Sequence, residues 1–542
     1  MKIKFSLLAI ILLASVLRLY KLDTYPAINA DEAAIGYNAY SLIETGLDEH
    51  GNPWPVHFQS FNDWKPGLIF YLVIPTIKLL GLTALGIRLI PALLGIGTVF
   101  TLYFLVYELF RNKYQALAAS FVLAISPWHI HFSRGAWETN VATFFIISGT
   151  LFFVKSSRKS IFFIPSAIFF ALSLYTYHSA RILTPLLGLF LVLIYNKHFR
   201  QKKRHIFLSG LLLLIIVLPL VLDFFGPAGL SRASGVGLFA DSGPIHKINE
   251  QRRHHNTHLP SVSRVFHNKA TTFAFAFMEN WSRHFDGSFL FINGDEIERN
   301  KVPEMGQLHL FELITIGTAL IAIAKAPNKS WALVFTWLLL SPIAASLTFQ
   351  SPHALRAQAM SVPLAIVSGF GLYKILVAPR PAKLHGTLVK WGVVGSIAII
   401  IIWSLAYYLQ MYYVHMAKKY PFSSQYGVSE LFNYINVYKN DYKKIIITDR
   451  YDQPYILALY YLNFPPEKFQ NSHNLSSKDE FGFSTVRNFG QFSFRSIGFE
   501  EDLENHKDAL IIGTDEEIPD EANVVKEIYG TNSYKYFQIV AN

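Results

Sequence analysis

Two adjacent carboxylates, Asp31 and Glu32, stand at the start of a segment that predicts a helix over residues 30–46. Asn29 is the expected N-cap, Glu32 three residues later completes a capping box, and Gly46 is a typical stop. Asp31 then lies in the first turn, where the helix dipole stabilises a carboxylate by about 0.3–1 kcal/mol. An ionised carboxylate of this kind can act as a general base or hold a cation. Helix capping alone would also explain both residues.

Further side chains that can bind phosphate or move a proton stand in short segments between apolar runs. Arginine can hold a phosphate with two hydrogen bonds, and a lysine near the headgroup layer can bind a lipid phosphate. The candidates are Lys65, Arg88, Arg134, Glu138, Tyr177, His178, Arg181, His353 and Arg356. For the basic residues the alternative is an interfacial anchor whose charged end reaches out of the apolar layer. For His178 it is a structural, hydrogen-bonded histidine.

The composition indicates that these segments connect membrane-spanning helices. Of the 542 residues, 52% are hydrophobic and 16% are charged, whereas soluble domains carry about 25% charged residues. Long uncharged runs recur, for example residues 207–222 and 393–409, and such runs are typical of membrane spans. The net charge of +11 lies mainly in short connectors, which argues against nucleic-acid binding. The chain has no cysteine, which excludes disulfides and thiolate chemistry.

The basic connectors predict how the spans are oriented. Five of them contain no Asp or Glu and should be cytoplasmic together with the N-terminus: residues 111–114, 155–160, 197–205, 325–329 and 380–390. The spans that fit between them lie near residues 4–20, 87–110, 115–130, 139–154, 160–175, 182–196, 206–224, 308–325, 330–348, 358–378 and 389–415. We therefore expect a polytopic α-helical membrane body of eleven spans over residues 1–416, anchored in the plasma membrane.

The same arrangement predicts the external loops. They are residues 21–86, 131–138, 176–181, 225–306 and 349–357, and they contain the candidate residues or border them. Residues 65–81 form an apolar segment that would invert every later basic loop if it crossed the membrane. We interpret this segment as an interfacial helix opened by Lys65 and Pro66, with a true span as the alternative. The histidine-rich loop 225–306 lacks an HExxH motif, which favours a lid or an acceptor-binding loop over a metal site.

After residue 416 the pattern changes to that of a soluble domain. Residues 444–449, 509–513 and 534–540 read as strands, and residues 453–462 read as a helix. An odd number of spans places this small α/β domain, residues 417–542, outside the cytoplasm. No glycine-rich phosphate loop follows residues 444–449, which argues against nucleotide binding. A stability cap and an acceptor-docking module both remain open as its role.

The order of the motifs resembles the GT-C class of membrane glycosyltransferases. The resemblance rests on Asp31-Glu32, on Lys65-Pro66, on Arg88 to Pro91 and on the segment from Ser126 to Glu138, and it covers roughly residues 1–375. Within the class, protein O-mannosyltransferases and the aminoarabinose transferases of lipid A are the most similar. Those families often carry aspartate where this chain has Glu138.

The resemblance implies an enzyme that moves a sugar from a polyprenyl-phosphate carrier to an acceptor on the external face, with inversion. Asp31 would be the general base, and Glu138 would orient the acceptor or share a divalent cation with Asp31. Lys65, Arg134, Arg181, His353 and Arg356 would bind the donor phosphate, and Glu32, Arg88, Tyr177 and His178 would support them. No cofactor is expected other than this divalent cation, which stays open, and the acceptor is a protein, a lipid or a glycan.

Two other functions fit a membrane body of this kind. A transporter or flippase of lipid-linked sugars would carry charged residues near the middle of its spans, whereas the polar groups here gather at the predicted external ends. An oligosaccharyltransferase-like enzyme would be expected to show a WWD-like motif in its soluble domain, and none is present.

Overall fold

The computed structural model of the chain describes residues 2–61, 63–196, 203–226, 237–238, 243–255, 260–377, 386–451, 453–477 and 484–542. Three of the segments discussed above lie partly outside these residues. They are the expected cytoplasmic connectors 197–205 and 380–390 and the loop 225–306, where His258 is among the residues not described. The chain forms two compact units. Unit 1 comprises Met1–Arg18, Leu93–Ser133 and Glu138–Tyr408, and unit 2 comprises Leu19–Ala92, Arg134–Trp137 and Leu409–Asn542.

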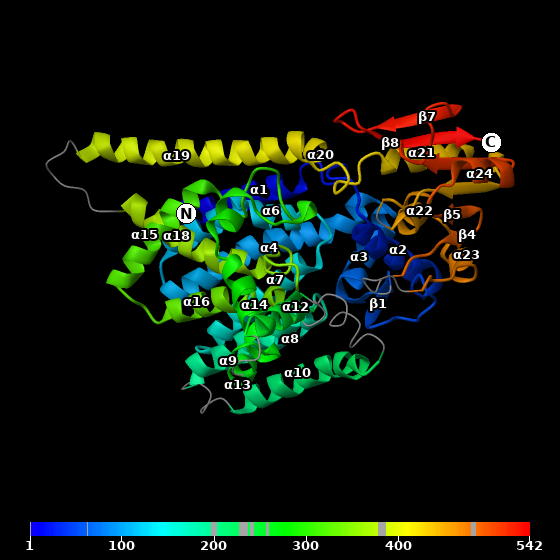
Figure 1. Cartoon of the computed structure of the whole chain (residues 1–542). Helices are drawn as coiled ribbons and strands as arrows, with labels where there is room; N and C mark the ends of the chain where they lie inside the picture. The colour runs from blue at the N-terminus through cyan, green and yellow to red at the C-terminus, as the bar shows by residue number, and fades with distance from the viewer. Residues whose placement is uncertain are drawn as a thin grey trace. The chain divides into compact units, whose positions relative to one another are not determined.

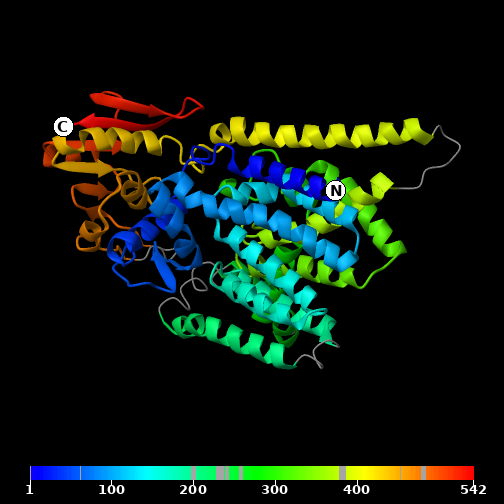
Figure 2. The ribbon, with the colours of Figure 1, turned by 180° about the vertical axis from the view of Figure 1, so that it is seen from behind.

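Unit 1 is a bundle of helices, shown from two sides in Figures 1 and 2. In it α18 packs against both α15 and α5, while α8 packs against α7 and α10. Its helices are α1 (Lys2–Leu19), α4 (Ala84–Phe110), α5 (Lys113–Ile125), α6 (Pro127–Ser133), α7 (Glu138–Ser156), α8 (Phe163–Leu174), α9 (Ala180–Ile194), α10 (Lys203–Phe224), α12 (Gly243–His254), α13 (Pro260–Phe266), α14 (Lys269–Arg283), α15 (Leu310–Lys325), α16 (Ser330–Leu340), α17 (Ile343–Ser346), α18 (Ser361–Val377) and α19 (Gly386–Gln410). Two of these helices extend into unit 2, which contains α4 up to Ala92 and α19 from Leu409 onward.

Several of these helices are suited to a membrane. In the described part of the chain, five helices are long and apolar enough to cross one, namely Ala84–Phe110, Glu138–Ser156, Lys203–Asp223, Gln358–Val377 and Trp391–Lys419. A sixth crossing results if α5 and α6, which meet at an angle of 59°, form one broken span. Helices also occupy the other expected spans, but several are shorter, as Ser160–Leu174 and Ala180–Ile194 are. The count of eleven crossings therefore stays a prediction.

The N-terminal part of unit 2 contains α2 (Ala30–Thr45), a short hairpin and α3 (Leu68–Leu80). The hairpin consists of β1 (His57–Ser60) and β2 (Asp63–Pro66), which pair antiparallel with Phe58 opposite Lys65. The expectation that Lys65 and Pro66 open the following helix is wrong, because both residues belong to β2 and the helix begins at Leu68. With 13 residues, α3 is shorter than the roughly 20 residues that a spanning helix needs.

The C-terminal part of unit 2 contains a six-stranded sheet in the order β4-β5-β3-β6-β8-β7. The strands are β3 (Lys444–Ile447), β4 (Asn488–Phe489), β5 (Phe492–Phe494), β6 (Ala509–Gly513), β7 (Val524–Tyr529) and β8 (Lys535–Ala541). The three expected strands correspond to β3, β6 and β8. The sequence did not reveal β4 and β5, which have two and three residues, or β7, which is only partly buried. The α-helices of this part are α20 (Met416–Lys419), α21 (Val428–Tyr438), α22 (Pro454–Tyr461), α23 (Pro466–Gln470) and α24 (Phe499–Asn505).

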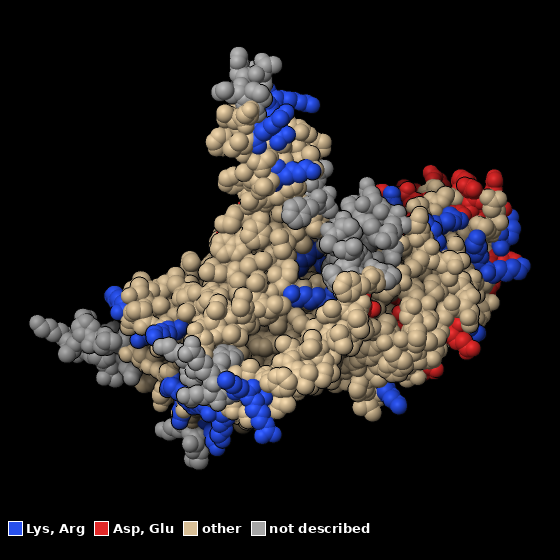
Figure 3. Space-filling view, turned by 90° about the horizontal axis from the view of Figure 1, so that it is seen from below, with Lys and Arg blue, Asp and Glu red and all other residues tan. Residues whose placement is uncertain are grey.

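Within unit 2, the C-terminal segment packs onto the first loop. Helix α2 contacts both α22 and α23, and the Tyr37 hydroxyl donates a hydrogen bond of 3.0 Å to the Phe464 carbonyl. The compact unit thus joins residues 19–92 to residues 409–542, whereas a division at residue 416 was expected from composition. Acidic side chains gather toward the right-hand edge of Figure 3, where the C-terminal elements lie in Figure 1.

Candidate functional site

The start of α2 has the geometry that its sequence predicts. The Glu32 amide donates a hydrogen bond of 2.9 Å to Asn29 Oδ1, and the Glu32 carboxylate accepts from the Asn29 amide, which completes the capping box. The helix ends at Gly46, whose φ of 75° is in the left-handed region that favours glycine. Asp31 therefore lies in the first turn, as expected.

Glu32 does much more than cap the helix. Its carboxylate accepts two short hydrogen bonds from Arg88, of 2.7 Å from Nε and 2.6 Å from Nη2, and a third of 3.0 Å from the Ala136 amide. Arg88 is fully buried and donates its other N–H groups to the carbonyls of Leu22, Pro26 and Ala27. Glu32 and Arg88 thus form a buried, bidentate pair that fixes the chain entering α2. This contact network leaves Glu32 little capacity to accept a substrate proton.

Asp31 faces a different partner. Its Oδ1 pairs with Nζ of Lys65, which β2 presents from the neighbouring hairpin. The Asp31 side chain is 27% exposed, whereas that of Lys65 is 7% exposed and also lies 5.3 Å from the centre of the Phe61 ring. The site thus combines a partly accessible carboxylate with an ammonium group that has little contact with solvent.

Arg134 lies in unit 2 as well, but it is fully buried. Its Nη2 donates to the carbonyl of Tyr25 at 3.1 Å, and its Nε donates to the Tyr412 hydroxyl at 3.3 Å. The guanidinium group also lies over the rings of Tyr412 and Tyr413. These contacts tie residues 19–25 to the segment that follows α19, so they give Arg134 a structural task that the sequence did not reveal.

The remaining candidates lie in unit 1. Glu138 is the first residue of α7 and is buried. Arg181 lies in the first turn of α9, where its Nε donates to the Leu174 carbonyl at 3.1 Å and its Nη1 lies 3.3 Å from Nδ1 of His178. Tyr177 is buried beside them. The structure thus brings Tyr177, His178 and Arg181 together at the junction where α8 ends and α9 begins.

His353 belongs to a buried polar cluster that was not expected. Its amide donates to Nε2 of His284 at 3.1 Å, and its Nδ1 lies 3.8 Å from the carboxylate of Asp295. Asp295 also accepts hydrogen bonds from the Ala354 and Ile297 amides and from the Asn300 side chain. Burial raises the pKa of Asp295 and lowers that of His284 to about 4. Arg356, at the edge of this cluster's loop, donates to the Thr348 hydroxyl at 2.6 Å.

The described residues contain no group of three or more His, Cys, Asp or Glu side chains arranged to hold a metal ion. Of the two carboxylates considered as cation ligands, Asp31 lies in unit 2 and Glu138 in unit 1. In the histidine-rich loop, the imidazoles of His255 and His267 are 3.1 Å apart at Nε2.

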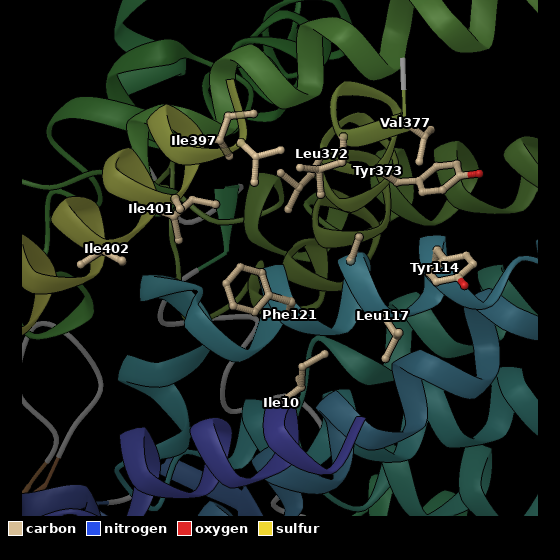
Figure 4. A pocket seen from close by; sticks show the side chains of 14 residues that line it. Ile10, Tyr114, Leu117, Phe121, Leu372, Tyr373, Val377, Ile397, Ile401 and Ile402 are labelled. Carbon is tan, nitrogen blue, oxygen red and sulfur yellow. The ribbon is translucent and has the colours of Figure 1, made fainter. Parts of the chain in front are cut away.

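Unit 1 also contains a groove with a volume of about 490 Å³ between α1, α5, α18 and α19 (Figure 4). Its walls are formed by aliphatic side chains and Phe121, and Tyr114 and Tyr373 lie together on one side of it. None of the candidate site residues lines this groove. Its walls suit a hydrocarbon chain and offer almost nothing to a polar ligand.

Comparisons with known proteins agree with this architecture. Residues 8–227 match the family model of dolichyl-phosphate-mannose-protein mannosyltransferases. The solved structures of ArnT from Cupriavidus metallidurans in the apo state and bound to undecaprenyl phosphate superpose with TM-scores of 0.55, at 11% and 12% identity. Each superposition covers 98% of this chain and 97% of ArnT. A comparison with curated proteins finds no match.

The family match over residues 8–227 and the shared fold support a membrane glycosyltransferase of the GT-C class. The helices of unit 1 support an integral membrane protein. The expectation drawn from the order of the sequence motifs is confirmed at this level.

Proposed function

We propose that this enzyme transfers a sugar from a polyprenyl-phosphate carrier to an acceptor hydroxyl at the extracytoplasmic face, with inversion, and that Asp31 is the general base. The observation that carries the proposal is the ion pair between Asp31 and Lys65. The pair joins a carboxylate, a group that can accept a proton, to an ammonium group, which can bind a phosphate, while the neighbouring Glu32 is engaged with Arg88.

The pair suggests how donor binding prepares the base. Without donor, Lys65 neutralises Asp31. A donor phosphate competes for the Lys65 ammonium, and Asp31 then accepts a hydrogen bond from the acceptor hydroxyl. The acceptor oxygen then bonds to the anomeric carbon from the face opposite the phosphate, and the bond between that carbon and the phosphate oxygen breaks. The hydroxyl proton moves to Asp31, and Lys65 stabilises the charge that develops on the leaving polyprenyl phosphate.

The residues of unit 1 extend the proposal. Glu138 orients the acceptor, and Arg181 and Arg356 add positive charge for the donor phosphate, with His353 as a further candidate. Arg181 and Arg356 are only partly buried, which supports a phosphate role better than the buried network around His353 does. The apolar groove of unit 1 supports accommodation of a lipid chain.

The proposed topology follows from the basic connectors. It has eleven crossings in the plasma membrane, a cytoplasmic N-terminus and an extracytoplasmic C-terminal domain. Asp31, Lys65 and the C-terminal segment then lie on the same side of the membrane, which fits their membership of one compact unit.

The test is Asp31→Asn in purified enzyme supplied with radiolabelled polyprenyl-phosphate sugars. Asparagine keeps the shape of the side chain but cannot take up the proton, so turnover should fall by about 10²- to 10⁴-fold. Glu44→Gln is the matched control, because Glu44 is an exposed acid on the same helix. Near-normal turnover by a folded Asp31→Asn protein would refute the role of Asp31. Transfer in detergent also separates an enzyme from a flippase, which needs two membrane faces.

A further inference from the structure

Three helices of the histidine-rich loop form a small arm of unit 1. The arm comprises α12, α13 and α14, drawn in green in Figure 1, with the described residues 243–255 and 260–283. Helix α12 packs against both α13 and α14. Nε of Arg252 donates a hydrogen bond of 2.7 Å to the His267 carbonyl, and the imidazoles of His255 and His267 meet at 3.1 Å. These contacts hold the end of α12 against the junction of α13 and α14.

Apolar side chains on two helices of the arm are exposed. In α13, Val262, Val265 and Phe266 have the spacing i, i+3 and i+4, so they share one face of the helix. Val265 and Phe266 are each 65% exposed, and in α14 Phe275 is 75% and Met278 54% exposed. Exposed apolar side chains that gather in this way are typical of a surface that contacts a membrane or a partner protein.

A hollow of about 430 Å³ joins the two groups of apolar side chains. Phe266 of α13 and Phe275 of α14 both line it, and so does Lys247 of α12. Glu279 lines it too, but its carboxylate forms an ion pair of 2.8 Å with Arg283. The hollow thus combines aromatic walls with a cationic side chain, as a site for an acyl chain below a phosphate headgroup requires.

The charge of the arm is positive. Its described residues include six Lys or Arg and two Glu, and one of these acids is the Glu279 that pairs with Arg283. The other acid, Glu250, offsets one of the remaining basic charges. The basic side chains besides Arg283 are all exposed, namely Lys247, Arg252, Arg253, Arg264 and Lys269. An excess of this kind attracts anionic lipid headgroups that lie within a Debye length.

The end of α14 is attached to the bundle beside α16 and α17. Helix α14 packs against α17, Nδ2 of Asn280 donates to the Thr348 carbonyl at 3.0 Å, and Nε1 of Trp281 donates to the Leu339 carbonyl at 3.0 Å. In the proposed topology the span over residues 330–348 reaches the external membrane boundary here, where tryptophan is enriched. The arm therefore leaves the bundle at the level of the lipid headgroups, which favours a lipid surface over a protein as its partner.

We propose that the α12–α14 arm binds the external surface of a bilayer that is rich in anionic phospholipid. The exposed face of α13 and the ring of Phe275 enter the acyl-chain boundary, one acyl chain occupies the hollow, and the basic side chains meet the phosphate groups. This inference goes beyond the proposed transfer reaction and takes only the external side of the loop from the proposed topology.

A fluorescent label on the full-length protein tests the contact with lipid. Ser261→Cys places an environment-sensitive dye on α13 at an exposed position next to Val262. In phosphatidylglycerol nanodiscs its emission should shift to shorter wavelength, and phosphatidylglycerol brominated in its acyl chains should quench it. The same dye at Lys468→Cys, an exposed position on α23, should keep water-like emission. Water-like emission at Ser261→Cys in every lipid would overturn the proposal and leave the arm to a protein partner.

The preference for anionic lipid is tested by removing charge. Arg253→Gln/Arg264→Gln removes two exposed charges and spares Arg252, which holds the His267 carbonyl. Each basic residue near an anionic surface contributes roughly a fivefold preference, which salt reduces. Quenching of the Ser261→Cys dye by brominated phosphatidylglycerol, relative to brominated phosphatidylcholine, should therefore fall on the order of tenfold.

The matched control removes two exposed charges from another part of the chain, as Lys468→Gln/Lys507→Gln does, and should leave this ratio unchanged. Equal quenching by both lipids in the otherwise unchanged protein would overturn the anionic preference.

Removal of the apolar contact is the second half of the test. Phe266→Ser/Phe275→Ser should return the Ser261→Cys dye to water-like emission, while the unfolding temperature stays the same because both rings are exposed. Unchanged emission would contradict insertion of these rings. All of these measurements are made without turnover, so a loss of transfer activity would leave their outcome unaffected.

Discussion

Adjacent residues at the start of α2 have separate tasks because their side chains leave the helix in different directions. Glu32 turns into the interior, where Arg88 and the Ala136 amide surround it. Asp31 turns toward β2 and remains partly exposed beside Lys65. Only the second environment suits a group that must exchange a proton with a substrate.

Glu32→Gln should destabilise the protein strongly while preserving the helix cap. Glutamine is accepted at this position of a capping box, but the substitution leaves the Arg88 charge buried without its anionic partner. Removing one partner of a buried ion pair costs about 3–5 kcal/mol. Thermal unfolding in detergent should therefore occur at a clearly lower temperature than in the wild type.

Arg88→Lys probes the geometry of the same pair. Lysine keeps the positive charge but cannot form two parallel hydrogen bonds to a carboxylate, so this variant should also unfold early. Wild-type unfolding temperatures for both Glu32→Gln and Arg88→Lys would show that the pair contributes little to stability.

At the scale of elements, α2 is the part that positions the proposed base. Its N-cap residue holds the first turn with side-chain hydrogen bonds, and the helix packs against α3, α22 and α23. Gly36 lets α4 approach closely, since a Cβ at this position would lie 2.4 Å from Cδ1 of Ile87. The hairpin of β1 and β2 then brings Lys65 to Asp31.

Asn29→Ala should weaken this arrangement, because it removes the side chain that caps the first turn of α2. Loss of an N-cap side chain costs about 0.5–2 kcal/mol, whereas Asn29→Ser keeps a capping oxygen and adds no charge beside the Glu32 carboxylate, to which the Asn29 side-chain amide donates. We expect Asn29→Ala to lower both the unfolding temperature and the turnover, because the first turn holds Asp31. Asn29→Ser should be more stable than Asn29→Ala, because serine is a good N-cap residue. Equal stability of the alanine and serine variants would rule out a role for the cap.

At the scale of the whole molecule, the natural absence of cysteine allows a direct test of the proposed topology. Single cysteines at Glu44 and Lys468, both exposed, should react in intact cells with an impermeant thiol reagent, and a cysteine at the exposed Lys113 should not. Labelling at Lys113 would reverse the orientation of α5 and promote α3 to a true span. After permeabilisation all three positions should react.

The sequence by itself determined the features that depend on near neighbours along the chain. The capping box of α2, the apolar helices, the strands β3, β6 and β8 and the order of the motifs each follow from local composition and spacing. The class of enzyme follows from that order as well. The strand position of Lys65 was missed, because its pairing with Phe58 depends on a turn that joins two short, weakly patterned segments.

Only the tertiary structure decided which polar groups meet. Glu32 and Arg88 are 56 positions apart in the chain, and the imidazoles of His50 and His473, which lie 2.9 Å apart, are separated by 423 positions. Buried charges must find partners or become neutral, and which outcome applies depends on packing between distant segments. Asp31 and Glu32 look equivalent in the sequence, and the fold alone separates a partly exposed base from a buried structural anion.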